Sequence, residues 1–138
     1  MAASEPPSSS RPRRPRQALG AFFISSGTLH FTHTRYYVAI MPPYLPAHRE
    51  LVYISGVAEI AGGAAALSPL RRAARWWLTL LLIAVFPANL HMALHPDQVE
   101  GLKLPRWLLW ARLPLQPLCI AWVWMATRGT GAAAAATR

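Results

Sequence analysis

The stretch LTLLLIAVFPANLHMAL at residues 78–94 limits most strongly what this chain can fold into. It belongs to one of four long apolar segments, which span about residues 18–38, 51–69, 74–94 and 106–127. Each comes close to the ~20 residues with which a helix crosses ~30 Å of hydrocarbon. Because lipid offers backbone groups no hydrogen-bond partners, such segments must be helical. The sequence therefore predicts an all-α fold, an integral membrane four-helix bundle.

The composition favours a membrane protein over a soluble one. Hydrophobic residues make up 54% of the 138 residues and charged residues only 14%, whereas a soluble domain usually has ~25% charged residues. The net charge of +9 comes from short basic clusters between apolar segments. A nucleic-acid-binding protein would instead carry a basic face, so we expect no nucleic-acid partner.

Two polar ends flank the apolar part of the chain. Residues 1–17 are rich in Pro, Ser and Arg without hydrophobic periodicity, so we expect a disordered basic head. The apolar segment that follows continues with a helical pattern, so we expect it to be retained rather than cleaved as a signal peptide. Residues 18–127 then form the transmembrane domain, and residues 128–138 form a flexible tail.

The basic residues indicate the orientation in the membrane. The clusters RPRRPR (11–16) and RRAAR (71–75), together with Arg128, place eight basic residues on one side of the predicted bundle, and the other side has at most four. The positive-inside rule therefore puts both termini in the cytoplasm. The six tryptophans fall near the ends of the segments, where interfacial anchors are expected.

Polar residues occur inside every apolar segment and at a similar depth. If the segments alternate in direction, all of them lie in the outer half of the membrane, and they are His30, Glu59, Asn89, Arg112 and Gln116. A charged residue facing lipid in mid-helix costs about 2.5 to 3.5 kcal/mol. We therefore expect these side chains to turn inward as one network, with Glu59 and Arg112 forming an ion pair or sharing water. The alternative is that the network only holds the helices together.

Three prolines interrupt the third and fourth segments at matching depth. Pro87, Pro114 and Pro117 each remove a backbone donor, so we expect helix kinks that open a cavity in the outer half of the bundle. Asn89 follows Pro87 closely and is expected to face this cavity. His91 lies ~200° further around the helix and is therefore not expected to face the cavity. The loop at 41–50, stiffened by three prolines, is either a lid over the cavity or an ordinary tight connection.

Several kinds of catalytic centre are excluded by the residues present. Cys119 is the single cysteine, so neither an internal disulfide nor a redox pair of cysteines can form. There is no HExxH motif, no phosphate-binding glycine loop and no cysteine cluster for iron–sulfur. We expect no metal site and no autonomous catalytic activity. A bis-histidine haem on His30 and His91 is disfavoured by the different directions of the two side chains.

Five stretches resemble the DoxX-like family of small four-helix bacterial membrane proteins. They are GTLHF (27–31), MPPYLP (41–46), LVYISGVAEIAGG (51–63), AVFPANLHMAL (84–94) and RLPLQPL (112–118). The resemblance covers about residues 18–127, is weaker in the first segment and does not include the basic head. It implies a multi-pass protein of the bacterial inner membrane, linked to quinone-coupled redox systems. It also implies that the family's motif positions are His30, Glu59, Asn89, Arg112 and Gln116.

Two classes of function follow from these observations. The first is an auxiliary membrane component of a redox system, which binds a quinone as its cofactor or positions a partner oxidoreductase. The cavity would supply hydrogen-bond donors to the two quinone oxygens inside an apolar slot. The second is a structural or scaffolding protein, or a small transporter subunit that acts as a homo-oligomer. In both cases the lipid bilayer is the first partner.

Overall fold

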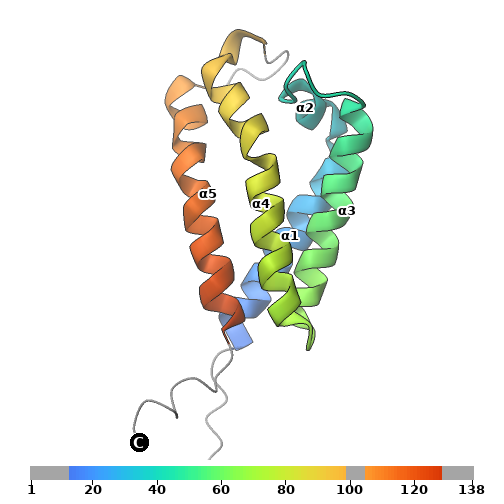
Figure 1. The fold of residues 1–138 in the computed structure, drawn as a ribbon, viewed down its shortest axis with the longest axis vertical. Coiled ribbons are helices and arrows are strands. Elements are labelled where there is room, and N and C mark those ends of the chain that lie inside the picture. The colour runs from blue at the N-terminus through green and yellow to red at the C-terminus, as the bar shows by residue number, and fades with distance from the viewer. Residues whose placement is uncertain (1–12, 99–104, 129–138) are drawn as a thin grey trace, which may run out of the picture.

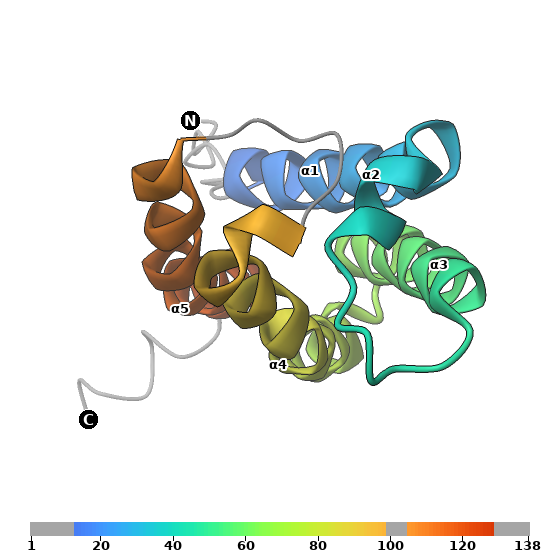
Figure 2. The ribbon, with the colours of Figure 1, turned by 90° about the horizontal axis from the view of Figure 1, so that it is seen from above.

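The computed structural model describes residues 13–98 and 105–128. In these ranges all regular structure is helical, which confirms the all-α prediction. The helices are α1 (Arg13–Thr32), α2 (Thr34–Ala39), α3 (His48–Leu67), α4 (Arg71–Leu94), the 3-10 turn η1 (Pro96–Gln98) and α5 (Arg106–Thr127). The four long helices run alongside one another and alternate in direction (Figure 1). The short α2 lies across one end of this bundle (Figure 2), which we call the α2 end.

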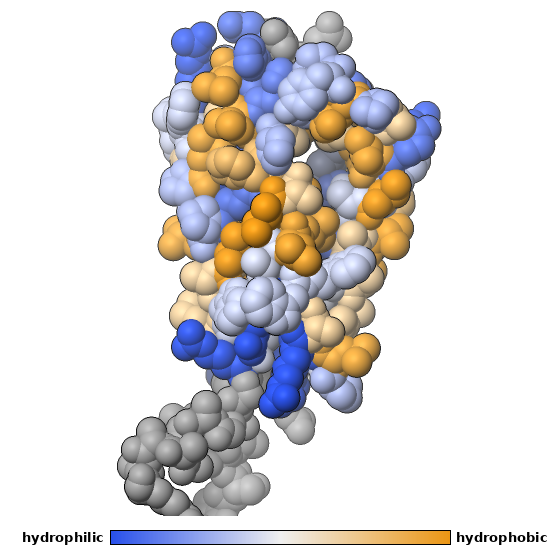
Figure 3. All heavy atoms as spheres, in the orientation of Figure 1, coloured by the Kyte–Doolittle hydropathy of each residue, from blue (hydrophilic) through white to orange (hydrophobic). Residues whose placement is uncertain are grey.

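Three of the described helices are long and apolar enough to cross a membrane, namely α3, α4 and α5. These helices support the prediction of a membrane protein. α1 has 20 residues but is less apolar, because it combines arginines near its start with Gln, Ser, Thr and His residues along its length. The space-filling view shows apolar side chains around the middle of the molecule and hydrophilic ones towards both ends (Figure 3).

The first helix differs from its predicted bounds of 18–38. α1 begins at Arg13, so residues 13–17 are helical and the prediction of a disordered head is wrong for them, whereas residues 1–12 lie outside the described part. Arg, Gln and Ala are good helix formers, and Pro15 is tolerated because it falls in the first turn. The chain then turns at His33, and the hydroxyl of Thr34 donates to the carbonyl oxygen of His30 at 2.8 Å. A separate helix, α2, follows this turn.

The other long helices lie close to their predicted bounds. α5 has the predicted bounds, and α3 begins three residues earlier than expected. α4 begins at Arg71 rather than residue 74, so the basic cluster RRAAR forms its first turn. Of the predicted tail, Arg128 follows α5 in an extended conformation, and residues 129–138 lie outside the described part.

Glycines bring α1 and α3 into backbone contact. A Cβ atom built on Gly56 would lie 2.9 Å from the carbonyl oxygen of Gly27, and one built on Gly63 would lie 2.8 Å from that of Gly20. Each helix therefore carries two glycines seven residues apart, and they pair in antiparallel register. Small residues at such positions allow helix backbones to approach closely within a membrane.

Two apolar clusters of the described residues lie at opposite ends of the bundle. The larger one joins all four long helices at the end opposite α2 and includes Leu19, Phe23, Ala66, Leu78 and Val123. The smaller one, at the α2 end, consists of Met92, Ala93 and Leu109. The space between these clusters holds the polar residues described next.

Candidate functional site

A cavity of about 210 Å³ lies between the two apolar clusters. Side chains from all four long helices and from α2 line it. The polar ones are Ser26, His30, Tyr37, Ser55, Glu59, Asn89 and Arg112. Phe22, Phe23, Val52, Leu82 and Val85 contribute apolar walls. Four of the five predicted site residues thus line one cavity, and the fifth, Gln116, bonds to one of them.

His30 and Glu59 form the most buried polar pair of the cavity. The Nε2 atom of His30 lies 3.8 Å from Oε1 of Glu59, and the two side chains are 8% and 13% exposed. The Nδ1 atom of His30 donates to the carbonyl oxygen of Ser26 at 3.0 Å, and the ring stacks on Tyr37 with centroids 3.8 Å apart. These contacts fix the imidazole with one edge towards Glu59.

The other carboxylate oxygen of Glu59 has a different environment. Oε2 is buried and has no hydrogen-bond partner among the described residues, although the Ser26 hydroxyl interacts with the carboxylate as a whole. A buried acceptor without a partner costs about 1–3 kcal/mol. A ligand or a water molecule in the cavity can donate the missing hydrogen bond to Oε2.

Arg112 does not form the predicted ion pair with Glu59. Within the described part of the chain the ionic partner of Glu59 is His30, and the prediction of a direct Glu59–Arg112 pair is therefore wrong. Arg112 is exposed on α5 and lines the same cavity. Because His30 comes from the helix in backbone contact with α3, it lies nearer to Glu59 than a side chain from α5. Arg112 instead supplies a positive charge and several donors to the cavity wall.

Asn89 and Gln116 connect α4 to α5. The Nδ2 atom of Asn89 donates to Oε1 of Gln116 at 3.3 Å, and the amide of Gln116 donates to the carbonyl oxygen of Leu82. Gln116 is 6% exposed. The predicted inward direction of Asn89 is confirmed, since it lines the cavity. His91, two residues away, instead faces Tyr44 and stacks on His95 with centroids 4.6 Å apart.

The proline-containing helices stay continuous through their prolines. α4 contains Pro87, and α5 contains Pro114 and Pro117, without interruption of either helix. All three proline rings are exposed rather than directed into the bundle. Pro87 leaves the carbonyl of Ile83 without its usual donor, and the amide of Gln116 reaches the neighbouring carbonyl of Leu82. The cavity therefore exists without a break in either helix.

The start of the proline-rich connection between α2 and α3 contributes to the cavity wall. Ile40 and Met41 line the cavity at the start of this connection. Pro42 is buried, and its carbonyl oxygen accepts a hydrogen bond from Nε2 of His48 at 2.9 Å. The start of the connection is thus fixed to the first turn of α3 and forms part of the cavity wall.

Comparison with protein-family models finds a family that matches most of this chain. The family model that matches residues 19–136 is described as a domain of unknown function, DUF8561. The chain belongs to this family. Comparison with curated proteins and with solved structures finds no match. The match covers all four long helices apart from the first turns of α1, so the cavity lies within the family domain.

Several cavity residues of this DUF8561 protein are not identified by sequence reasoning. Tyr37, Ser26, Ser55 and Cys119 line the cavity together with the predicted residues. A signal exists for the two serines, since Ser26 precedes His30 by four residues and Ser55 precedes Glu59 by four. Residues four apart lie on one helix face. Tyr37 gives no such signal, because the turn at His33 separates it from α1.

The lining of the cavity combines polar side chains with aromatic walls. In residues 13–98 and 105–128, no group of three or more His, Cys, Asp and Glu side chains is arranged to hold a metal. The cavity wall combines the cationic side chain of Arg112, the acceptor Oε2 of Glu59 and the phenyl rings of Phe22 and Phe23.

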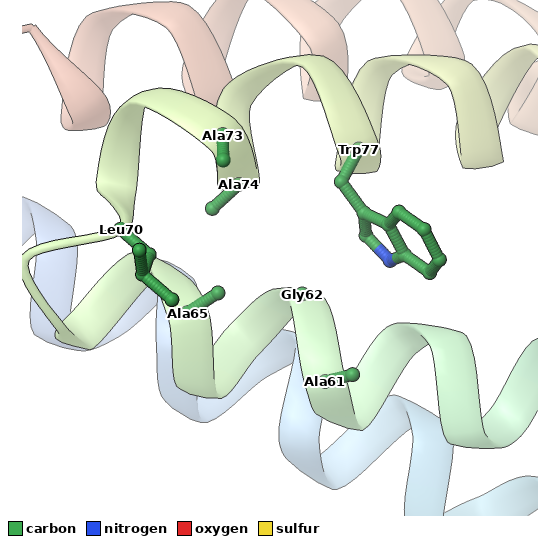
Figure 4. A pocket seen from close by; sticks show the side chains of 7 residues that line it. All are labelled: Ala61, Gly62, Ala65, Leu70, Ala73, Ala74 and Trp77. Carbon is green, nitrogen blue, oxygen red and sulfur yellow. The ribbon is translucent and has the colours of Figure 1, made fainter.

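A second pocket of this DUF8561 protein, of about 260 Å³, lies between α3 and α4 towards the end opposite α2. Small residues line it, with Leu70 near one end and Trp77 near the other (Figure 4). The indole nitrogen of Trp77 donates to the carbonyl oxygen of Ala58 at 2.9 Å. Its lining side chains are apolar apart from that indole, so this pocket offers no group for acid–base chemistry.

Proposed function

We propose that this chain is a four-helix integral membrane protein that binds a quinone head group in the polar cavity. It acts as an auxiliary component of a quinone-linked redox system, as the resemblance to DoxX-like proteins implies, together with a membrane or redox protein partner. The observation that carries this proposal is the convergence of His30, Glu59, Asn89 and Arg112 on one cavity with apolar walls.

The fold supports a fourth membrane span besides α3, α4 and α5. α1 has 20 residues, enough to extend ~30 Å at ~1.5 Å per residue. It lies antiparallel to α3 with glycine contacts at two levels. The basic residues of the α1 and α4 first turns lie at the end opposite α2 (Figure 1). The positive-inside rule then favours both termini in the cytoplasm, in a bacterial inner membrane.

The size and polarity of the cavity support a quinone head group. Sites for drug-sized ligands measure ~300–1,000 Å³, so a cavity of about 210 Å³ suits a single substituted ring. Both oxygens of a quinone accept hydrogen bonds. Arg112 offers several donors in the cavity wall, and Phe22 and Phe23 offer aromatic surfaces to the ring.

The alternative is a structural or scaffolding role, and the link between Asn89 and Gln116 favours it. These two side chains connect α4 to α5, and polar contacts of this kind hold membrane helices together. Glu59→Gln and Arg112→Gln discriminate between the two roles. If both variants fail to accumulate in the membrane, the polar network is structural. If they accumulate normally and change quinone binding, the network is a ligand site.

The test of quinone binding uses the full chain purified in detergent. Its lipid extract is analysed for quinone, and a short-chain benzoquinone is then titrated into the quinone-free protein. We expect saturable binding at one site per chain, weakened at least tenfold by Arg112→Gln. Arg106→Gln is the matched control, because Arg106 lies on the same helix and its side chain is 75% exposed. A protein that carries no quinone and binds none when it is added overturns the proposal.

A further inference from the structure

We propose that the cavity binds the reduced quinol more tightly than the oxidised quinone, with Oε2 of Glu59 accepting a hydrogen bond from a quinol hydroxyl. This inference rests on the proposed quinone-binding function and specifies which redox form of the ligand the site retains. It is carried by the hydrogen bonds of His30 and by the environment of Glu59.

The hydrogen bond between His30 and Ser26 determines which ring nitrogen carries a proton. Nδ1 of His30 lies 3.0 Å from the carbonyl oxygen of Ser26, and a carbonyl oxygen can only accept. Nδ1 is therefore protonated. Nε2, the atom that faces Oε1 of Glu59 at 3.8 Å, would repel an ionised carboxylate if it were a bare lone pair. The pair is consequently stable when it holds one further proton, on Nε2 or on Oε1.

Oε2 of Glu59 remains an acceptor wherever that further proton lies. If it is on Nε2, the carboxylate is ionised and Oε2 carries negative charge. If it is on Oε1, Oε2 is a carbonyl oxygen. In both cases Oε2 needs a donor, and within the described chain it has none, although it is buried. Asn89 donates to Gln116 and Gln116 donates to Leu82. The Ser26 hydroxyl interacts with the carboxylate but makes no hydrogen bond to Oε2.

The two redox forms of the ligand differ at this atom. A quinone presents only acceptors, so its oxygen beside Oε2 would bring two acceptors together and leave both without a donor. A quinol presents a hydroxyl in the same place and donates its proton to Oε2. Arg112, which also lines the cavity, can donate to an oxygen of either form, so it does not discriminate between them. The preference therefore comes from Glu59.

The test measures both redox forms on the same detergent-purified full chain. A short-chain benzoquinone and its chemically reduced quinol are titrated separately, the quinol under argon. We expect the quinol to bind at least tenfold more tightly, and a tenfold preference raises the midpoint potential of the bound couple by about 30 mV. Glu59→Gln should abolish this preference, because an amide nitrogen in the place of Oε2 donates to the quinone. Glu50→Gln, an exposed site on the same helix, should keep it.

The possible outcomes separate this inference from the proposed function. If neither form binds, quinone binding itself is overturned and the redox preference with it. If both forms bind with equal affinity, or the quinone binds more tightly, quinone binding stands and the preference for quinol is overturned. The comparison on the unaltered chain decides this even if Glu59→Gln fails to accumulate. A preference that survives unchanged in a well-folded Glu59→Gln protein would remove Glu59 as its cause.

Discussion

Gly27 of α1 and Gly56 of α3 are in backbone contact: a Cβ atom built on Gly27 would lie 2.5 Å from the carbonyl oxygen of Gly56. One turn beyond each glycine lies a member of the buried pair, since His30 follows Gly27 by three residues and Glu59 follows Gly56 by three. The close approach of the two backbones thus brings the imidazole within 3.8 Å of the carboxylate. Helix packing and the geometry of the candidate site depend on the same glycines.

Replacing Gly56 by Ala should destabilise the protein. Alanine is more favourable than glycine in a helix by about 1 kcal/mol, so the exchange would stabilise α3 if the methyl group had space. A Cβ at this position would lie 2.8 Å from Cβ of His30, and overpacking of this kind costs about 1–3 kcal/mol. We expect a net loss of stability and a displaced His30, measured as a lower melting temperature in detergent.

A substitution on the exposed face of the same helix serves as the control. Ala64→Val also adds methyl groups to α3, but Ala64 is exposed. It should leave the melting temperature nearly unchanged. A Gly56→Ala protein that melts at or above the temperature of the unaltered chain would show that α1 and α3 do not touch at this level.

Arg75 connects the start of α4 to the end of α5 by hydrogen bonds. Its guanidinium donates to the hydroxyl of Thr127 at 3.0 Å and to the carbonyl oxygen of the same residue at 2.8 Å, and it lies 4.9 Å from the ring centroid of Trp124. Hydrogen bonds from a charged group contribute about 1.5–3 kcal/mol. Arg75→Gln should therefore lower the free energy of unfolding by a similar amount, measured by denaturation in mixed micelles. The neighbouring exposed Arg72 gives the control, since Arg72→Gln should have no effect.

Much of the fold and of the cavity could be predicted from the sequence, because a lipid bilayer restricts both the backbone conformation and the direction of polar side chains. A helix of about 20 apolar residues is one of few structures that lipid tolerates. A polar side chain within it is far less costly when it faces the bundle. These two facts predict the long helices and the inward direction of His30, Glu59, Asn89 and Gln116.

The pairing of these groups could not be predicted in the same way. Which polar side chains meet depends on the rotation and register of each helix, and inward direction alone leaves several pairs possible. The register of α1 against α3 is encoded by Gly20 and Gly27 opposite Gly63 and Gly56, which stand seven residues apart in each helix. The end of α1 was also missed, because the turn at His33 has no proline or glycine to mark it.

Asn89 and Gln116 should behave as one energetic unit. Each single substitution, Asn89→Leu or Gln116→Leu, removes their shared hydrogen bond and leaves a polar partner buried between α4 and α5. The double variant removes both polar groups. We therefore expect the double variant to lose less stability than the sum of the single losses, with a coupling of about 0.5–2 kcal/mol. A double-mutant cycle of unfolding free energies measures this, and additive losses would show that the two amides do not interact.

Cysteine labelling should place α1 in the membrane or outside it. The chain with Cys119→Ser receives one new cysteine at an exposed position, as Gln17→Cys, Tyr44→Cys or Arg72→Cys. If α1 crosses the membrane, a membrane-impermeant thiol reagent added to spheroplasts labels the protein with Tyr44→Cys and spares the other two until the membrane is opened. If only α3, α4 and α5 cross, the positions 17 and 44 lie on one side and label together. Labelling at Arg72→Cys, with or without labelling at Gln17→Cys, would contradict the orientation derived from the basic residues.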